Sequence, residues 1–239
     1  MSDNRSINLV LLPGLLNDAR LWQHQTRALA PLADIAVGDL TAAASIADLA
    51  ASVLARAPAG PFALAGLSIG GYVAFEIMRQ APQRILALAL LDTSARPDTE
   101  EASANRHKLI AQARQDFSQV APALMQKLLH PDHVKEPAIA DVFVQMAGRV
   151  GRDAFIRQQT AIMSRIDSRP FLKEIACPTL VLCGREDQLT PVDVHEEMVA
   201  CLPRATMTIV EHSGHLSALE QPEAVSAAMQ TWLESIAVN

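Results

Sequence analysis

The chain has 239 residues, of which 50% are hydrophobic and 19% are charged, and its formal net charge is -6. A chain of this composition is globular and long enough to bury a large core, which excludes a disordered protein. The acidic balance, without any run of Lys and Arg, argues against nucleic acid as a partner.

Signals for export or membrane insertion are not found in the sequence. Residues 1–6 are polar and the apolar run behind them ends at Pro13, so we expect no signal peptide. No apolar stretch approaches the roughly 20 residues that cross a bilayer, and we expect no membrane partner. The cysteines are odd in number and lack metal-ligand spacing: Cys177, Cys183 and Cys201. Buried thiols in a reducing cytosol fit this pattern, so a cytoplasmic protein is predicted.

Strands and helices alternate through the first part of the chain. Apolar runs predict buried strands at Ile7–Leu12, Asp34–Gly38, Phe62–Ala65 and Ile85–Leu91. Helical patterns lie between them at Trp22–Leu29, Ser45–Ala57 and residues 73–79. Ser45 and Asp48 are spaced as a capping box at the start of the second helix.

The stretch 94–169 has no buried strand pattern and instead predicts helices alone. They cover Glu100–Gln115, Phe117–Leu129, Pro137–Gly148 and Arg152–Arg165. Strands resume at Pro178–Gly184 and Thr206–Val210, and a closing helix is predicted at Pro222–Ser235. The alternation predicts an α/β protein with a mostly parallel, doubly wound sheet and right-handed crossovers. Residues 1–93 and 170–239 then form one core, and residues 94–169 form a helical insertion at the carboxyl ends of the strands, where ligands bind in such sheets.

A Gly-x-Ser-x-Gly motif lies between a predicted strand and a predicted helix. Its glycines, Gly66 and Gly70, keep Cβ atoms away from Ser68, which must adopt a strained conformation on so tight a turn. The turn places the Ser68 hydroxyl above the sheet, beside unpaired N–H groups at a helix N-terminus. We interpret Ser68 as a nucleophile.

A serine nucleophile needs a base, and the base needs a carboxylate that orients it. Asp187 follows one later strand and His215 follows the last one, so both should lie at the same edge of the sheet as Ser68. The order Ser, Asp, His is the one expected for this turn. Glu186 and Asp92 remain alternatives for the acid, and His212 for the base.

The remaining histidines are interpreted as structural or exposed: His24, His107 and His195. The stretch His130-Pro131-Asp132-His133 could suggest a metal site, but its proline favours a turn, and no metal or cofactor is predicted. An oxyanion hole requires two N–H donors. We expect them to be the backbone N–H of Ile69, directly after the nucleophile, and that of Leu15, after the break at Pro13-Gly14.

Together these motifs resemble the α/β-hydrolase superfamily over essentially the whole chain. The matching stretches are Leu12-Pro13-Gly14-Leu15, Gly66 to Gly71, Gly184 to Pro191, and Gly214-His215 with Glu220-Gln221-Pro222 behind it. Gly14 to Asn17 with Trp22 is most similar to small serine carboxylesterases, including the pimeloyl-carrier-protein methyl esterases. The resemblance implies that the insertion is a lid. Two departures are Pro13, where the family usually has histidine, and a start too short for the family's antiparallel opening hairpin.

The resemblance implies hydrolysis of a carboxylic ester through an acyl-Ser68 intermediate. Apolar residues expected to contact a small-molecule substrate are Leu16, Trp22, Met125, Leu129, Met163 and Leu216. Four arginines of the insertion could instead bind an acidic substrate or an acyl carrier protein: Arg106, Arg149, Arg157 and Arg165. The same triad could serve enol-lactone or carbon–carbon bond hydrolysis or a menaquinone-type synthase, and a non-catalytic ligand-binding protein is a further alternative.

Overall fold

The computed structural model describes residues 7–237, and the polar start on which the signal-peptide prediction rests lies outside them. No helix in this part of the chain is long and apolar enough to span a membrane.

Six parallel strands form one sheet, in the order β2-β1-β3-β4-β5-β6. The strands are β1 (Ile7–Leu12), β2 (Ala33–Val37), β3 (Phe62–Leu67), β4 (Ile85–Leu91), β5 (Thr179–Gly184) and β6 (Ala205–Val210). Every residue of β3 and β5 is buried, because helices cover both faces of the sheet. The predicted parallel, doubly wound sheet is confirmed, and an antiparallel opening hairpin is not found among residues 7–237.

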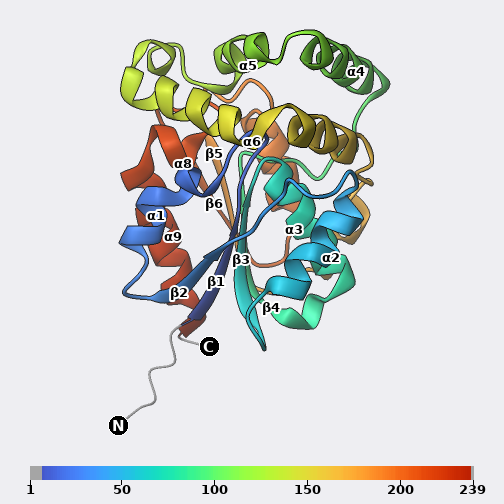
Figure 1. Ribbon diagram of the computed structural model, residues 1–239. Coiled ribbons are helices and arrows are strands. Elements are labelled where there is room, and N and C mark those ends of the chain that lie inside the picture. The colour runs from blue at the N-terminus through green and yellow to red at the C-terminus, as the bar shows by residue number, and fades with distance from the viewer. Residues whose placement is uncertain (1–6, 238–239) are drawn as a thin grey trace.

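Helices pack on the two faces of the sheet as two separate layers (Figure 1). One face carries α2 (Ile46–Arg56) and α3 (Ile69–Gln80), and the other carries α1 (Gln23–Ala28) and α9 (Pro222–Ala237). Alternate residues of β1 enter different cores, Leu9 and Leu11 on the α9 side and Val10 and Leu12 on the α3 side. Successive apolar residues of the strand therefore pack into the cores on opposite faces of the sheet.

Two helices of the second half were not predicted from the sequence. They are α7 (Val192–Cys201), between β5 and β6, and the single turn α8 (Ser217–Glu220) before α9. The predicted helix at Trp22–Leu29 is shorter, since a 3-10 turn at Ala19–Trp22 precedes α1. At the start of α2, Ser45 Oγ accepts from Asp48 N at 3.1 Å, but it also donates to Asp48 Oδ2 at 2.6 Å. The Asp48 carboxylate thus binds the Ser45 hydroxyl, so the pair differs from the predicted capping box.

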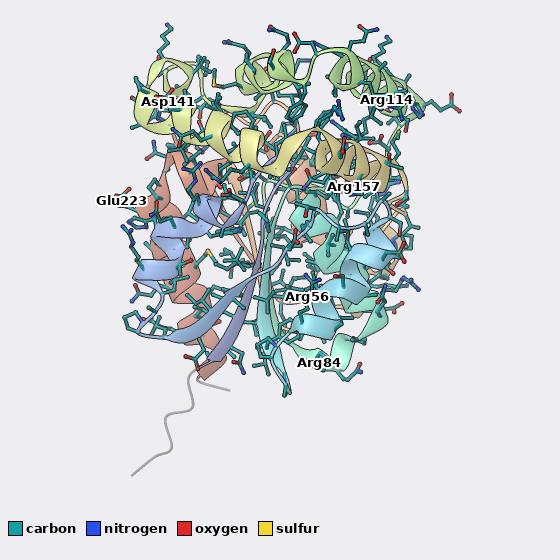
Figure 2. The ribbon with its side chains drawn as sticks, in the orientation of Figure 1. Arg56, Arg84, Arg114, Asp141, Arg157 and Glu223 are labelled. Atoms are coloured by element: carbon teal, nitrogen blue, oxygen red, sulfur yellow. The ribbon has the colours of Figure 1, made fainter. Side chains whose placement is uncertain are left out.

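The insertion between β4 and β5 consists of α4 (Glu100–Gln115), α5 (Val120–Leu128) and α6 (Pro137–Met163). These helices lie across the carboxyl end of the sheet (Figure 1). The two helices predicted at Pro137–Gly148 and Arg152–Arg165 are the halves of α6, which Gly151 interrupts with φ 78° and ψ 170°. Charged side chains such as Arg114 and Asp141 of the insertion and Arg56 and Glu223 of the core are exposed (Figure 2).

Candidate active site

Ser68 occupies a sharp turn between β3 and α3, with φ 56° and ψ -117°. The turn brings backbone segments so close that a Cβ on Gly66 would lie 2.3 Å from the Gly70 carbonyl oxygen. A Cβ on Gly70 would lie 2.4 Å from the carbonyl oxygen of Leu12 in β1. Ser68 N donates to Leu91 O at 3.0 Å and Thr93 Oγ1 donates to Ser68 O at 2.8 Å, so β4 holds the strained residue in place.

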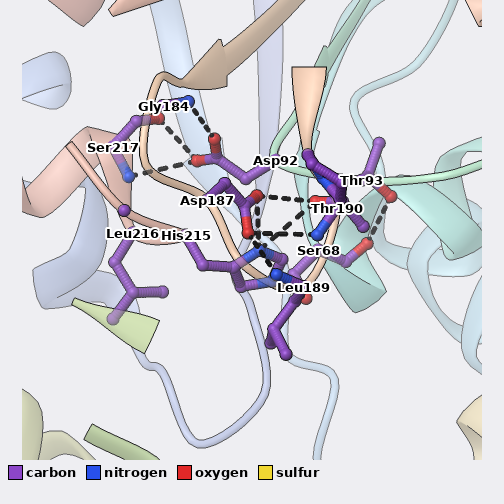
Figure 3. Close-up of polar contacts among 12 residues, drawn as sticks. Ser68, Asp92, Thr93, Gly184, Asp187, Leu189, Thr190, His215, Leu216 and Ser217 are labelled. Atoms are coloured by element: carbon purple, nitrogen blue, oxygen red, sulfur yellow. Dashed lines mark hydrogen bonds and ion pairs between the residues drawn. The ribbon is translucent and has the colours of Figure 1, made fainter. Parts of the chain in front are cut away.

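Three polar side chains from distant parts of the chain form a line at the carboxyl edge of the sheet (Figure 3). His215 Nε2 lies 2.8 Å from Ser68 Oγ, and His215 Nδ1 lies 2.8 Å from Asp187 Oδ2. Because the ring donates from Nδ1 to the carboxylate, Nε2 is left to accept the hydroxyl proton of Ser68. The geometry therefore provides a nucleophile, a base and an orienting acid.

Asp187 is fixed by its own loop after β5. Its carboxylate accepts hydrogen bonds from Leu189 N at 2.8 Å, Thr190 N at 3.1 Å and Thr190 Oγ1 at 2.6 Å. Burial alone would raise the pKa of Asp187, but His215 and Thr190 lower it overall. Burial likewise disfavours the charged form of His215, yet Asp187 raises the pKa of His215 above its usual value. Each partner thus favours the charged form of the other.

The alternative acids and base have other partners. Glu186 Oε2 accepts from Ser213 N at 2.9 Å. Asp92 is fully buried, and its carboxyl group accepts from Gly184 N at 2.9 Å and from Ser217 Oγ at 2.6 Å. Burial and the nearby Asp187 raise the pKa of Asp92 to about 8. His212 is exposed, with φ 54°. Of the residues considered, the geometry brings only Asp187 and His215 into line with Ser68.

Other histidines have structural partners. His195 Nε2 accepts from Thr93 N at 3.1 Å, and burial lowers the pKa of His195 to about 4. His24 Nδ1 lies 2.8 Å from Ser226 Oγ. His133 Nδ1 lies 2.8 Å from Glu220 Oε2. Within the described part of the chain, no group of three or more His, Cys, Asp or Glu side chains could hold a metal ion.

The two predicted oxyanion donors belong to the start of α3 and to the loop after β1. Ile69 is the first residue of α3, so its N–H has no acceptor within the helix. In the loop after β1, Leu16 N donates to Gln158 Oε1 at 3.1 Å and Asn17 N donates to Gly14 O at 3.1 Å. No acceptor among residues 7–237 is found for the N–H of Leu15. Neither predicted donor has a backbone acceptor in the described part of the chain, and Leu16, which follows Leu15, has φ 60°.

Gln158 and Thr190 contact this site, although the sequence analysis gave neither of them a role. Gln158 comes from α6 of the insertion and is fully buried, with its Nε2 donating to Leu40 O at 3.2 Å. No local motif marks a residue that meets the loop after β1 from 142 positions away. Thr190 could have been found, because it lies three residues after Asp187 on the same turn.

Most residues predicted to contact substrate belong to the core on the α9 side. Leu16, Trp22, Leu129 and Leu216 are buried together there, and Met125 packs against them. Leu216 is drawn beside His215 in Figure 3. Met163, the last residue of α6, is not part of this cluster.

The four arginines of the insertion bind groups of this chain. Arg106 and Arg165 pair with Asp98 at 2.9 Å and 2.6 Å, and Arg149 Nε donates to Asp18 Oδ2 at 2.7 Å. Arg157, labelled in Figure 2, donates to Thr41 O at 2.7 Å. The contacts of Arg149 and Arg157 attach the insertion to the core, whereas Arg106 and Arg165 pair with Asp98 inside the insertion.

Comparisons with known proteins identify the family of the chain. Residues 7–222 match the family model described as alpha/beta hydrolase fold. A pimeloyl-[acyl-carrier protein] methyl ester esterase of Neisseria meningitidis is 25% identical over 79% of this chain, and the matched region spans 62% of that relative. A putative carbamate hydrolase, RutD, of Serratia proteamaculans is 25% identical over 94% of this chain and 90% of its own length.

Solved structures extend the likeness to nearly the full chain. An esterase of Thermogutta terrifontis has a TM-score of 0.88 and 27% identity, covering 97% of this chain and 90% of that one. The family model spans both the serine turn and the loop that carries His215. The chain is an enzyme of the alpha/beta hydrolase family.

Proposed function

We propose that this hydrolase cleaves carboxylic esters of small molecules, with Ser68 as the nucleophile. The observation that carries the proposal is the line from Ser68 Oγ to His215 Nε2 and from His215 Nδ1 to Asp187 Oδ2, with both separations at 2.8 Å. The esterase activity named for the Thermogutta terrifontis structure supports it.

In the proposed reaction, Ser68 Oγ attacks the ester carbonyl carbon while His215 Nε2 takes the hydroxyl proton. The carbonyl oxygen becomes an oxyanion, held by the N–H groups of Leu15 and Ile69. As the carbon–oxygen bond to the alcohol breaks, His215 returns the proton to the leaving alkoxide, and an acyl-Ser68 remains. A water molecule, deprotonated by His215, then releases the acid and restores the serine. Asp187 orients the imidazole and stabilises its charged form in both halves.

The proposed substrate is a free small ester rather than an ester on an acyl carrier protein. The relatives named as pimeloyl-[acyl-carrier protein] methyl ester esterases favour the carrier-bound substrate. In this chain, however, the insertion arginines considered for an acidic carrier already bind Asp98, Asp18 and Thr41. A carrier protein would have to compete with these internal partners.

Replacing Ser68 by alanine tests the assignment. We expect Ser68→Ala to lower kcat for a short p-nitrophenyl ester by at least about 10⁴-fold and to abolish labelling by a fluorophosphonate probe. The exposed Ser118, whose side chain bonds Asp116 and Gln119 of its own turn, serves as the control. Ser118→Ala should hydrolyse the ester and react with the probe like the wild type. Hydrolysis by folded Ser68→Ala at the wild-type rate would overturn the proposal.

A further inference from the structure

Glu220 is a buried carboxylate that lies next to the proposed base without contacting its ring. It is the last residue of α8, and its side chain has no exposed surface. Oε1 accepts from Gly214 N at 3.0 Å and from Leu216 N at 3.2 Å. These are the residues on either side of His215, so one carboxylate oxygen holds the peptide groups that flank the proposed base.

The other oxygen of Glu220 binds the insertion. Oε2 accepts from His130 N at 2.6 Å and lies 2.8 Å from His133 Nδ1. Both histidines belong to the segment 128–133 at the end of α5. A carboxylate at this depth persists only where its oxygens are satisfied, and here each oxygen binds a different part of the chain.

Two further contacts join the same two segments. His215 N donates to Leu128 O at 2.7 Å. The backbones approach so closely that a Cβ on Gly214 would lie 2.7 Å from Leu128 O and 2.8 Å from His130 N. The N–H groups of three successive residues, 214–216, thus bind either Glu220 or the insertion. The loop that carries His215 has little freedom to move apart from segment 128–133.

We propose that Glu220 is a positioning residue for His215 and that it links the insertion to the base, so that segment 128–133 and the loop 213–216 move together. This inference rests on the proposed function, since it concerns the geometry with which His215 serves Ser68. The consequence is that an insertion displaced at segment 128–133 would also displace the base. Such a link would couple the placement of the insertion to the activity of the triad.

The pH dependence of kcat/KM distinguishes a positioning role of Glu220 from a purely structural one, because the charge of Glu220 acts on His215. Burial lowers the pKa of His215, and Asp187, Asp92 and Glu220 raise it. The titratable groups that face His215 are Asp187 after β5, Asp92 at the end of β4, His195 on α7 and Glu220 on α8. His215 must be neutral to act as a base, so activity is lost as the pH falls through its pKa. Removing the Glu220 charge lowers that pKa and moves the acid limb of kcat/KM to lower pH.

The test compares Glu220→Gln and Glu220→Ala with Glu223→Gln, an exposed glutamate on the next helix whose side chain is 81% exposed. The amide of Glu220→Gln keeps one acceptor oxygen for Gly214 and Leu216, whereas Glu220→Ala removes all four bonds. For a p-nitrophenyl ester we expect kcat to fall about 10²-fold in Glu220→Ala and less in Glu220→Gln, with KM little changed. The acid limb of kcat/KM should move to lower pH in Glu220→Gln, because glutamine has nearly the same size and shape as glutamate but carries no charge. Glu223→Gln should match the wild type in both respects.

Hydrogen exchange tests the link itself. His133→Phe removes one bond to the insertion and leaves the two bonds to Gly214 and Leu216 in place. If the two segments are linked, His133→Phe should speed amide exchange in both 128–133 and 213–216, whereas faster exchange confined to 128–133 would overturn the link.

Ser68→Ala, assayed in parallel, separates the two proposals. If it is inactive while Glu220→Gln keeps wild-type kcat and an unmoved acid limb, only the role of Glu220 is wrong. If Ser68→Ala remains active, the proposed function is wrong and the role of Glu220 is overturned with it.

Discussion

Two buried carboxyl groups near His215 have opposite protonation behaviour. Asp187 accepts hydrogen bonds from its own loop and faces the imidazole, and its pKa lies below the usual value. Asp92 joins Gly184 to Ser217, and its pKa is raised to about 8 by burial and by the charge of Asp187. The charged form of Asp92 is therefore disfavoured and that of Asp187 is favoured, because two adjacent buried charges of the same sign are costly.

This difference predicts unequal effects of the same substitution. Asp187→Asn should lower kcat/KM at pH 7 by about 10⁴-fold, because an amide that donates to His215 Nδ1 selects the wrong tautomer of the ring. Asp92→Asn replaces a group whose charged form is already disfavoured by burial and by Asp187, and it should cost less than about tenfold. Ester hydrolysis by the two folded variants provides the measurement. A loss in Asp92→Asn as large as that in Asp187→Asn would reassign the orienting acid.

At the scale of single elements, the nucleophile turn depends on glycines that permit close backbone approach. Gly66→Ala would place a Cβ 2.3 Å from the Gly70 carbonyl oxygen, and a backbone atom cannot move aside as a flexible side chain can. We expect Gly66→Ala to lower the free energy of unfolding by about 3 kcal/mol. Gly148, within α6, has nothing within 4 Å of its Cβ position. Gly148→Ala should instead raise the free energy of unfolding by about 0.5–1 kcal/mol. Chemical denaturation measures both, and a Gly66→Ala protein as stable as Gly148→Ala would contradict the steric argument.

The elements that the sequence predicted well are those whose burial is continuous. The strands at Ile7–Leu12 and Ile85–Leu91 were predicted with the bounds that the structure has, because both of their faces are covered and nearly every residue is apolar. The helix α7 was not predicted, since its 10 residues carry a weak apolar pattern with His195 buried among them. The break predicted between Gly148 and Arg152 falls at Gly151, a single residue of positive φ.

The site could be predicted only as far as chain order and strand ends determine it. Ser68, Asp187 and His215 each follow a parallel strand, so the topology alone brings them to one edge of the sheet. Glu220 was singled out only as part of the stretch behind His215. Its bond to His130 spans 90 positions of sequence and depends on how the insertion folds back, which no local pattern encodes.

At the scale of the whole molecule, a buried charge cluster joins the two ends of the insertion next to the core. Asp98, before α4, has a side chain that is 2% exposed and binds Arg106 of α4 and Arg165 beyond the end of α6. The guanidinium of Arg165 also lies 4.5 Å from the ring centre of Tyr72 on α3. The Asp98 carboxylate thus joins the first helix of the insertion to the segment after its last helix, and Arg165 contacts the helix that follows the nucleophile.

Removing this charge should loosen the two ends of the insertion. Asp98→Asn leaves two arginines without their buried partner and should lower the free energy of unfolding by about 3 kcal/mol at pH 7. Asp153→Asn is the control, since Asp153 is 70% exposed in its pair with Arg152 and should contribute less than about 1 kcal/mol. Limited proteolysis should then cut the insertion faster in Asp98→Asn than in the control. Equal stability of the two variants would show that Asp98 does not hold the insertion.

The same prediction carries a pH dependence with a defined sign. Burial would raise the pKa of Asp98, but Arg106 and Arg165 hold it below its ordinary value of 3.8. A carboxyl group with a lowered pKa in the folded state binds fewer protons there than in the unfolded chain, so its stabilisation is complete above about pH 5 and declines as the pH falls through 3.8 towards the folded-state pKa. The stability difference between wild type and Asp98→Asn should therefore be constant from about pH 5 to 7 and shrink below pH 3.8. Denaturation series at several pH values measure that difference directly, and a difference that grew on acidification would mean that the ion pairs with Arg106 and Arg165 do not stabilise the fold.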